Sequence, residues 1–161
     1  MNHVSYPELK VYVGCALTHA SEDFKKQVEE FKQELRNVCE VLCFLDIGEA
    51  TPNAVYQHDI HNCVMQSDLL VAITDQPSTG LGYEMATQTE ARRKPLLAIA
   101  HEDSIVSDLI LDTRQPGFRF IRYKNLHTDV IPVIQNILAE IWAEHGHLPL
   151  FPSSPVDENA A

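Results

Sequence analysis

The sequence of 161 residues has no apolar run approaching the roughly 20 residues that a helix needs to cross a bilayer. Its first ten residues also lack an apolar signal core, so we expect neither a membrane span nor export. Positive charge is scarce, because 12 Lys and Arg stand against 23 Asp and Glu, for a net charge of −11. This balance argues against nucleic acid polymers and membranes as partners, but a single nucleotide can still be held by backbone N–H groups and hydroxyls.

Several common motifs are also missing. There is no GxGxxG and no Walker pattern, which argues against a dinucleotide-binding enzyme or an NTP-driven motor. The four cysteines form no CxxC pair and match no zinc spacing, so we predict buried, reduced thiols in a cytoplasmic protein. His58 and His61 stand at i and i+3, but no third ligand accompanies them, and we predict neither a metal nor a cofactor.

Segments typical of strands and helices alternate along the chain. Apolar runs predict strands at 9–15, 40–45, 68–73, 96–100 and 118–123. Apolar residues spaced three and four apart predict a helix of about 17 residues that begins at Ser21 and further helices at 54–66, 78–93, 106–111 and 130–144. A loop that contains Gly48 and Pro52 is predicted at 46–53. The pattern indicates one α/β domain, 1–148, built on a mostly parallel five-stranded sheet, and a loose tail, 149–161.

The segment from Asp68 to Glu84 is the most informative. A buried strand at 69–73 leads through a turn to Ser78, which is suited to cap a helix carrying Gly80, Gly82 and Glu84 in its first two turns. Glycines at a helix start allow a ligand to approach backbone N–H groups closely. Glu84, near the positive end of the helix dipole, is suited to stay ionised for nucleophilic attack, although most helix glutamates are surface residues.

Further candidates follow from the expected sheet, whose site should lie at the carboxyl ends of the strands. The loop from Gly14 to His19 would form one wall of that site, and Cys15 would line it. Asp59, in the helix before the third strand, could be the acid that protonates a leaving group, or could belong to a solvated helix face.

The order of Gly14, Asp59, Asp68-Leu-Leu-Val-Ala72 and Pro77-Ser-Thr-Gly-Leu-Gly-Tyr-Glu84 resembles the nucleoside 2-deoxyribosyltransferase family over residues 9–123. The segment from Gln76 to Glu84 is most similar to the branch that hydrolyses 2′-deoxynucleoside 5′-monophosphates. The resemblance implies a flavodoxin-like, three-layer fold and cleavage of an N-glycosidic bond, with transfer of the sugar to another base or to water.

The same resemblance assigns roles to individual residues. Glu84 would attack the anomeric carbon and form a covalent glycosyl–enzyme, and Asp59 would protonate or orient the departing base. Ser78 would contact the phosphate, and Ser107 would match a second phosphate-contacting serine that the partner subunit supplies, which implies a homodimer or a higher homo-oligomer. Substrate would be bound by Gly14, Cys15, Ser78, Gly80, Gly82 and Ser107.

Three positions depart from the pattern of the family. Leu17 stands where the hydrolases carry a phosphate-binding arginine, and His19 is the nearest candidate to replace it. Asp59 and Asp68 are one residue further apart than usual, which would rotate the Asp59 side chain by about 100° unless a bulge absorbs the extra residue. The tail from Pro149 matches nothing that the transferases use from a neighbouring subunit.

Three functions remain open from the sequence. The first is an enzyme of this family, acting as a transferase or only as a hydrolase. The second is a non-catalytic nucleotide-binding module, since a fold does not determine a function. The third is a flavin-binding electron carrier, which is disfavoured because the loop after the first strand has no Ser- and Thr-rich phosphate cradle.

Overall fold

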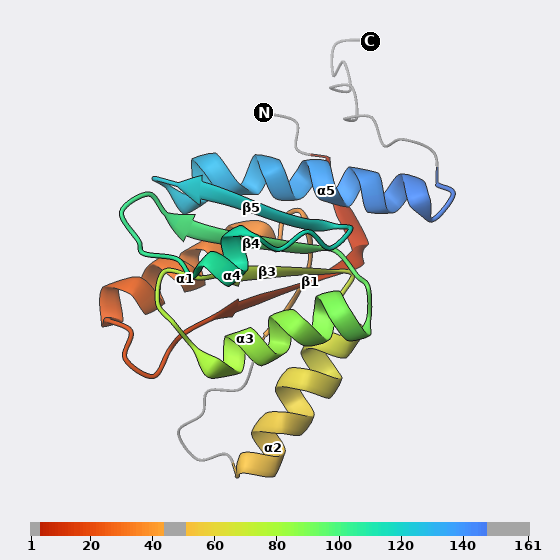
Figure 1. Ribbon diagram of the computed structural model, residues 1–161. Coiled ribbons are helices and arrows are strands. Elements are labelled where there is room, and N and C mark those ends of the chain that lie inside the picture. The colour runs from red at the N-terminus through yellow and green to blue at the C-terminus, as the bar shows by residue number, and fades with distance from the viewer. Residues whose placement is uncertain (1–3, 44–50, 148–161) are drawn as a thin grey trace.

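The structure is a computed structural model that describes residues 4–43 and 51–147. A five-stranded sheet lies at its centre (Figure 1). The strand order is β2-β1-β3-β4-β5 and every neighbouring pair is parallel, which confirms the predicted flavodoxin-like α/β architecture. The strands are β1 (Tyr6–Cys15), β2 (Cys39–Leu42), β3 (Leu69–Ile73), β4 (Leu96–His101) and β5 (Phe118–Tyr123).

Helices connect the strands, and several change type along their length. The long helices are α1 (Glu22–Leu35) and α5 (Ile131–Glu144), the latter preceded by the π-helix η4 (Leu126–Val130). Helix α2 (Pro52–Tyr56) continues as the π-helix η1 (Gln57–Cys63) and the 3₁₀ turn η2 (Val64–Gln66). Helix α3 (Thr79–Ala86) continues as the π-helix η3 (Thr87–Ala91), and α4 (Asp108–Leu111) is a single short turn.

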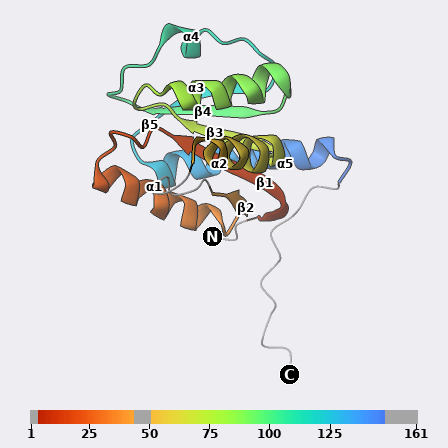
Figure 2. The same cartoon turned by 90° about the horizontal axis from the view of Figure 1, so that it is seen from below.

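The core consists of one apolar cluster on each face of the sheet, because successive strand residues point to opposite sides. On one face Val11, Val13 and Val71 pack with α1 and α5. On the other face Tyr12, Leu70 and Ala72 pack with η1 and α3. Figure 2 shows α1 and α3 on opposite sides of the sheet. Burying a side chain such as Val71 stabilises the fold by roughly 1.5–3 kcal/mol.

The predicted elements agree with the structure except at their ends. Helix α2 begins at Pro52, inside the predicted loop 46–53, because Thr51 caps it through its hydroxyl and proline is favoured at the first helical position. The predicted tail and Gly48 lie outside the described residues. Among the helices of the described part of the chain, none has the length and apolar character to span a membrane.

Candidate active site

The candidate site lies at the carboxyl ends of β1 and β3, on the left of Figure 1. Gly14 pairs with Ala72 and Cys15 with Ile73 in the last two positions of this strand pair. The chain leaves β1 toward β2 and leaves β3 toward β4, in opposite directions across the sheet. Such a switch point is where ligands bind in this class of fold, and α3 begins directly beside it.

Glu84 points from the second turn of α3 inward to β1. Ser78 sets the start of that helix, since its Oγ accepts the N–H of Leu81 at 3.2 Å. The Tyr12 hydroxyl donates a hydrogen bond to Glu84 Oε1 at 3.2 Å. The Glu84 carboxylate is therefore held between α3 and the sheet and does not extend into bulk solvent.

Gly14 makes room for this carboxylate. A Cβ atom at Gly14 would lie 2.9 Å from Glu84 Oε2 and 2.9 Å from Leu81 Cδ1, which is closer than real Cβ contacts. A side chain at position 14 would therefore displace the Glu84 carboxylate or the Leu81 side chain from its observed place.

Two opposing influences determine the protonation of Glu84. Burial and the charge of Asp59 raise the pKa of Glu84 to about 7, while the hydrogen bond from Tyr12 lowers it. The Tyr12 phenol stays protonated, because burial and the nearby carboxylates raise its pKa far above its ordinary value. Glu84 can therefore exchange between the neutral and the ionised form near neutral pH.

Asp59 lies close enough to Glu84 for its charge to act there, despite the extra residue before Asp68. Asp59 lies in η1, and a π-helix, which bonds i to i+5, holds more residues per turn than an α-helix and so has room for an extra residue. Burial raises the pKa of Asp59, and the neighbouring His58 lowers it. The structure thus brings together Gly14, Asp59 and Glu84 from three separate elements.

Sequence reasoning missed two contributors, Tyr12 and Cys63. Tyr12 lies two residues before Gly14 in β1 and so shares its face of the sheet, a relation that strand alternation could have revealed. Cys63 is buried, and its Sγ lies 3.7 Å from His58 Nδ1. Within residues 4–43 and 51–147, no group of three or more His, Cys, Asp or Glu is arranged to hold a metal ion.

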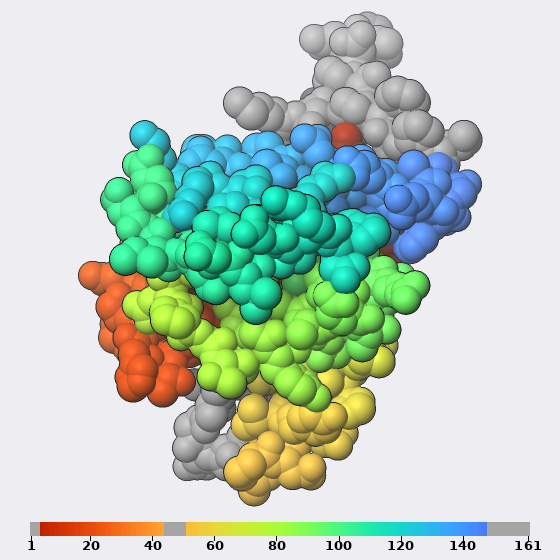
Figure 3. All heavy atoms as spheres, in the orientation of Figure 1, coloured from red at the N-terminus to blue at the C-terminus, as the bar shows by residue number. Residues whose placement is uncertain are grey.

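A polar cavity of about 330 Å³ lies between the loop after β1 and the start of α3. Figure 3 shows these two segments, in orange-red and yellow-green, next to each other on the surface. The cavity is lined by Ala16, Thr18, His19, Gln76, Pro77, Ser78, Thr79 and Gly80. Gly80, which lines the cavity, precedes Glu84 by one turn of α3, and Glu84 itself is not among the lining residues.

A second cavity, of about 270 Å³ and mainly apolar walls, lies on the other side of the α3 start. Ser78, Gly82 and Ser107 all line it. Ser107 Oγ accepts the N–H of Leu109 at 3.3 Å and caps α4. Ser107 and Ser78 of the same chain therefore line one cavity. That a partner subunit supplies its own serine to the site stays a prediction.

The cysteines differ from the prediction in their burial. Cys39 and Cys63 are buried, but Cys43 is exposed and Cys15 is half-buried, all as free thiols. The Cys15 side chain packs against the cluster on the α1 face, opposite to Glu84. Burial raises the pKa of Cys15 to about 11, so it is a neutral thiol near pH 7.

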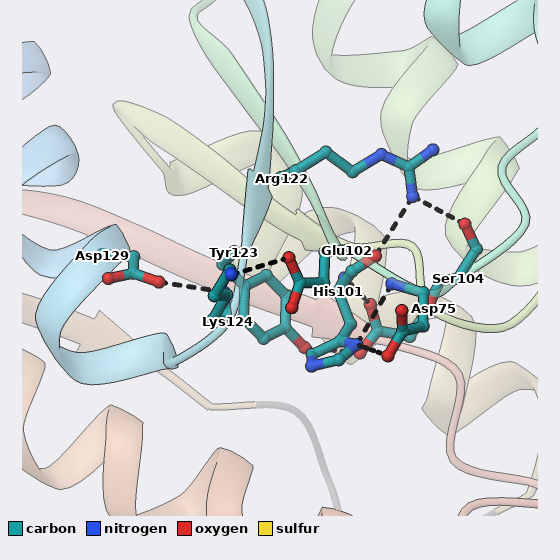
Figure 4. Close-up of polar contacts among 9 residues, drawn as sticks. Asp75, His101, Glu102, Ser104, Arg122, Tyr123, Lys124 and Asp129 are labelled. Carbon is teal, nitrogen blue, oxygen red and sulfur yellow. Dashed lines mark hydrogen bonds and ion pairs between the residues drawn. The ribbon is translucent and has the colours of Figure 1, made fainter.

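Asp75 anchors the loop that leads to Ser78 (Figure 4). Its Oδ1 accepts the backbone N–H of His101 at 2.6 Å, and its Oδ2 accepts the Tyr123 hydroxyl at 2.5 Å. Arg122 fixes the same strand ends, since Nη1 donates to the carbonyl oxygens of His101 at 3.1 Å and Ser104 at 2.6 Å. The carboxyl ends of β3, β4 and β5 are thereby tied together directly behind residues 76–78.

No known family profile matches the sequence. A protein of Syntrophotalea carbinolica, named "Putative 2′-deoxynucleoside 5′-phosphate N-hydrolase 1", is 39% identical over 108 residues, which cover 66% of this chain and 69% of that protein. The chain belongs to the nucleoside 2-deoxyribosyltransferase family. A protein of the same name from Thermofilum pendens is 33% identical over 85 residues, covering 51% of this chain and 58% of the relative. Membership confirms the predicted enzyme class, which cleaves N-glycosidic bonds.

Solved structures support the fold of this family member. The structure of Clostridium botulinum CMP N-glycosidase, BcmB, matches 78% of this chain and 97% of that chain with a TM-score of 0.54 and 20% identity. A lysine decarboxylase of Francisella novicida matches 88% of this chain, but only 18% of its own, with a TM-score of 0.50 and 13% identity. A similar architecture thus occurs as part of a much longer chain that is named a decarboxylase, so the architecture alone does not identify the reaction.

Proposed function

We propose that this enzyme hydrolyses the N-glycosidic bond of 2′-deoxynucleoside 5′-monophosphates through a covalent intermediate on Glu84. The observation that carries the proposal is the Glu84 carboxylate, held against Gly14 by the Tyr12 hydroxyl at the switch point of the sheet. The names of the two relatives support the substrate class.

The reaction follows the logic of a retaining glycosidase. An ionised Glu84 oxygen forms a bond to the anomeric carbon while the bond from that carbon to the base nitrogen breaks. Protonated Asp59 gives its proton to the departing base. Water then attacks the same carbon, Asp59 takes a proton from it, and Glu84 leaves as a carboxylate with release of 2-deoxyribose 5-phosphate.

The 330 Å³ cavity beside Gly80 is the proposed phosphate subsite. Ser78 Oγ accepts the N–H of Leu81, so its own O–H is still available to donate to a phosphate oxygen. The backbone N–H groups at the start of α3 favour an anion, and Thr18 and His19 add two further donors on the opposite wall. His19 stands in for the arginine that Leu17 replaces.

A second copy of the chain is proposed to cover the surface near Ser107. Among the described residues, Tyr83, Ile105 and Leu109 are apolar or aromatic and are 56%, 94% and 81% exposed. Leu109 lines an apolar cavity of about 380 Å³ together with Ser107, and Ile105 lines the cavity of about 270 Å³ that Ser107 also lines. Clustered exposed side chains of this kind mark interaction sites, which supports the predicted homodimer. The free cysteines support the predicted cytoplasmic location.

The test is release of free base from a panel of deoxynucleosides and their monophosphates, measured by chromatography with and without an acceptor base. The wild type should release base from at least one monophosphate without an acceptor, and Glu84→Gln should lower that rate at least about a thousandfold. Glu90→Gln is the matched control, since Glu90 is an exposed glutamate further along the same helical segment whose carboxylate accepts hydrogen bonds from Gln115.

Each other outcome points to a different function. Release that requires an acceptor base would mean transfer in place of hydrolysis. Binding without release across the panel would favour a non-catalytic nucleotide-binding module. An unchanged rate of base release in Glu84→Gln would show that Glu84 is not the nucleophile.

A further inference from the structure

The imidazole of His58 lies between two other side chains of the same π-helix. Its Nδ1 is 3.3 Å from Asp59 Oδ1 and 3.7 Å from Cys63 Sγ. The His58 side chain is 24% exposed and that of Asp59 is 16% exposed, so the contact is largely shielded from water. The ring thus contacts the candidate acid Asp59 from within the same helix.

The hydrogen on Nδ1 can be assigned from the surrounding donors. Cys63 donates its S–H to the carbonyl oxygen of Cys43 at 3.4 Å, so the sulfur can only accept from His58. Burial and nearby carboxylates raise the pKa of Cys63 to about 12, so this thiol keeps its hydrogen near neutral pH. We therefore assign the hydrogen to Nδ1 of His58, which donates it to Asp59 Oδ1 at the shorter of its two contacts.

This donation leaves Asp59 with one occupied and one available oxygen. Oδ1 is bound to His58, so the proton for the departing base has to sit on Oδ2. Once that proton has left, the carboxylate of Asp59 remains bonded to a donor that favours its charged form.

We propose that His58 is a positioning residue for this reaction, which fixes the carboxyl group of Asp59 and directs its free oxygen to the leaving base. The inference rests on the proposed function. Other groups that act around this contact are Cys63 on η1, Lys32 on α1, Tyr12 on β1 and Glu84 on α3. Among the described residues, His58 is the side chain that hydrogen-bonds Asp59.

The experiment compares His58→Ala and His58→Asn with His61→Ala in the base-release assay, over a range of pH. Asn keeps an N–H donor close to the position of Nδ1. His61 is the matched control, because it lies three residues along the same helix, is exposed, and packs its ring against Tyr56.

We expect His58→Ala to lower kcat about tenfold with KM changed less than about twofold. The alkaline limb of its kcat profile should move to higher pH, because loss of the donor raises the pKa of Asp59. His58→Asn should recover kcat to within about threefold of the wild type, and His61→Ala should match the wild type.

Two results would overturn the inference. One is a wild-type kcat and pH profile in His58→Ala. The other is a loss of kcat that Asn does not recover and that leaves the pH profile in place, since this pattern belongs to a residue needed only for folding. Wild-type and Glu84→Gln rates in the same assay test the proposed function separately, so the two failures are distinguishable.

Discussion

Glu84 and Asp59 are two partly buried carboxyl groups whose charges act on each other, and this relation suits them to the two different roles that we propose for them. Repulsion and burial discourage both from being ionised together, so one proton is favoured on the pair. Tyr12 donates to Glu84, and His58 donates to Asp59. A nucleophile that is ionised beside an acid that is protonated is the state that the first chemical step needs.

Tyr12→Phe should move the acid limb of kcat/KM to higher pH. The hydrogen bond from Tyr12 lowers the pKa of Glu84, which is about 7 with the bond in place. Without the hydroxyl this pKa rises, and a larger fraction of Glu84 is neutral and inactive at pH 7. A pH series of base release measures the shift, and a limb that stays in place would show that Tyr12 does not act on the nucleophile.

Gly14→Ala should lower kcat/KM about a hundredfold while the protein still folds. The new Cβ would meet Glu84 Oε2 and Leu81 Cδ1, and displacement of a reacting group by about 1 Å can cost that much. Gly82→Ala is the folding control, since a Cβ there meets nothing within 4 Å. Wild-type activity in Gly14→Ala would mean that Glu84 does not need its observed position.

At the residue scale the sequence was informative wherever a motif isolates a residue. Turns and glycines surround Gly14, Ser78 and Glu84 in the sequence. The place of these residues near the carboxyl ends of β1 and β3 could therefore be predicted. Tyr12 was not, because it lies inside an apolar strand where tyrosine is an ordinary core residue. Cys15 was expected at the site because it ends the strand, but alternation directs its side chain to the other face.

At the scale of the elements, the strands of the sheet could be predicted from the sequence, but the types of helix could not. Period-two and apolar-run patterns predicted all five strands of the described structure within a few residues. Nothing in hydrophobic spacing separates a π-helix from an α-helix over seven residues, so η1 was predicted only as part of one long helix. Yet η1 is the element that carries Asp59, whose charge acts on Glu84.

Tyr123→Phe tests the anchor behind the Ser78 loop. The hydroxyl of this buried tyrosine donates to the Asp75 carboxylate, a charge-assisted bond that connects β5 to the end of β3. Its loss should destabilise the fold by about 2 kcal/mol and lower Tm by about 5 °C. Tyr56→Phe, at an exposed tyrosine, should leave Tm unchanged in the same calorimetric scan. Equal Tm values for the two variants would show that the hydrogen bond from Tyr123 to Asp75 does not stabilise the fold.

At the scale of the whole molecule, net charge and exposed apolar surface bear on which partners the protein is expected to bind. A net charge of −11 disfavours nucleic acid polymers as partners, while the proposed phosphate subsite is a cavity at a helix start. The α/β class could be predicted from the alternation of elements. The surface around Leu109 could not, since it combines α3 with the region of α4 and is visible only after folding.

Leu109→Asp should convert the protein to a monomer in sedimentation. A charge in the middle of the proposed apolar interface disfavours association, and if the second copy supplies a serine to the site as proposed, its loss should lower base release from monophosphates about tenfold. Met65→Asp is the control at another exposed apolar residue, 42% exposed and outside this surface. A monomeric wild type with full activity would contradict the shared site.

The most direct test of the central claim is mass spectrometry of the enzyme quenched in acid during turnover of a deoxynucleoside monophosphate. The account predicts that the peptide containing Glu84 carries the added mass of one 2-deoxyribosyl 5-phosphate group, and that Glu84→Gln carries none. An adduct on a different residue, or rapid turnover with Glu84 never modified, would contradict it.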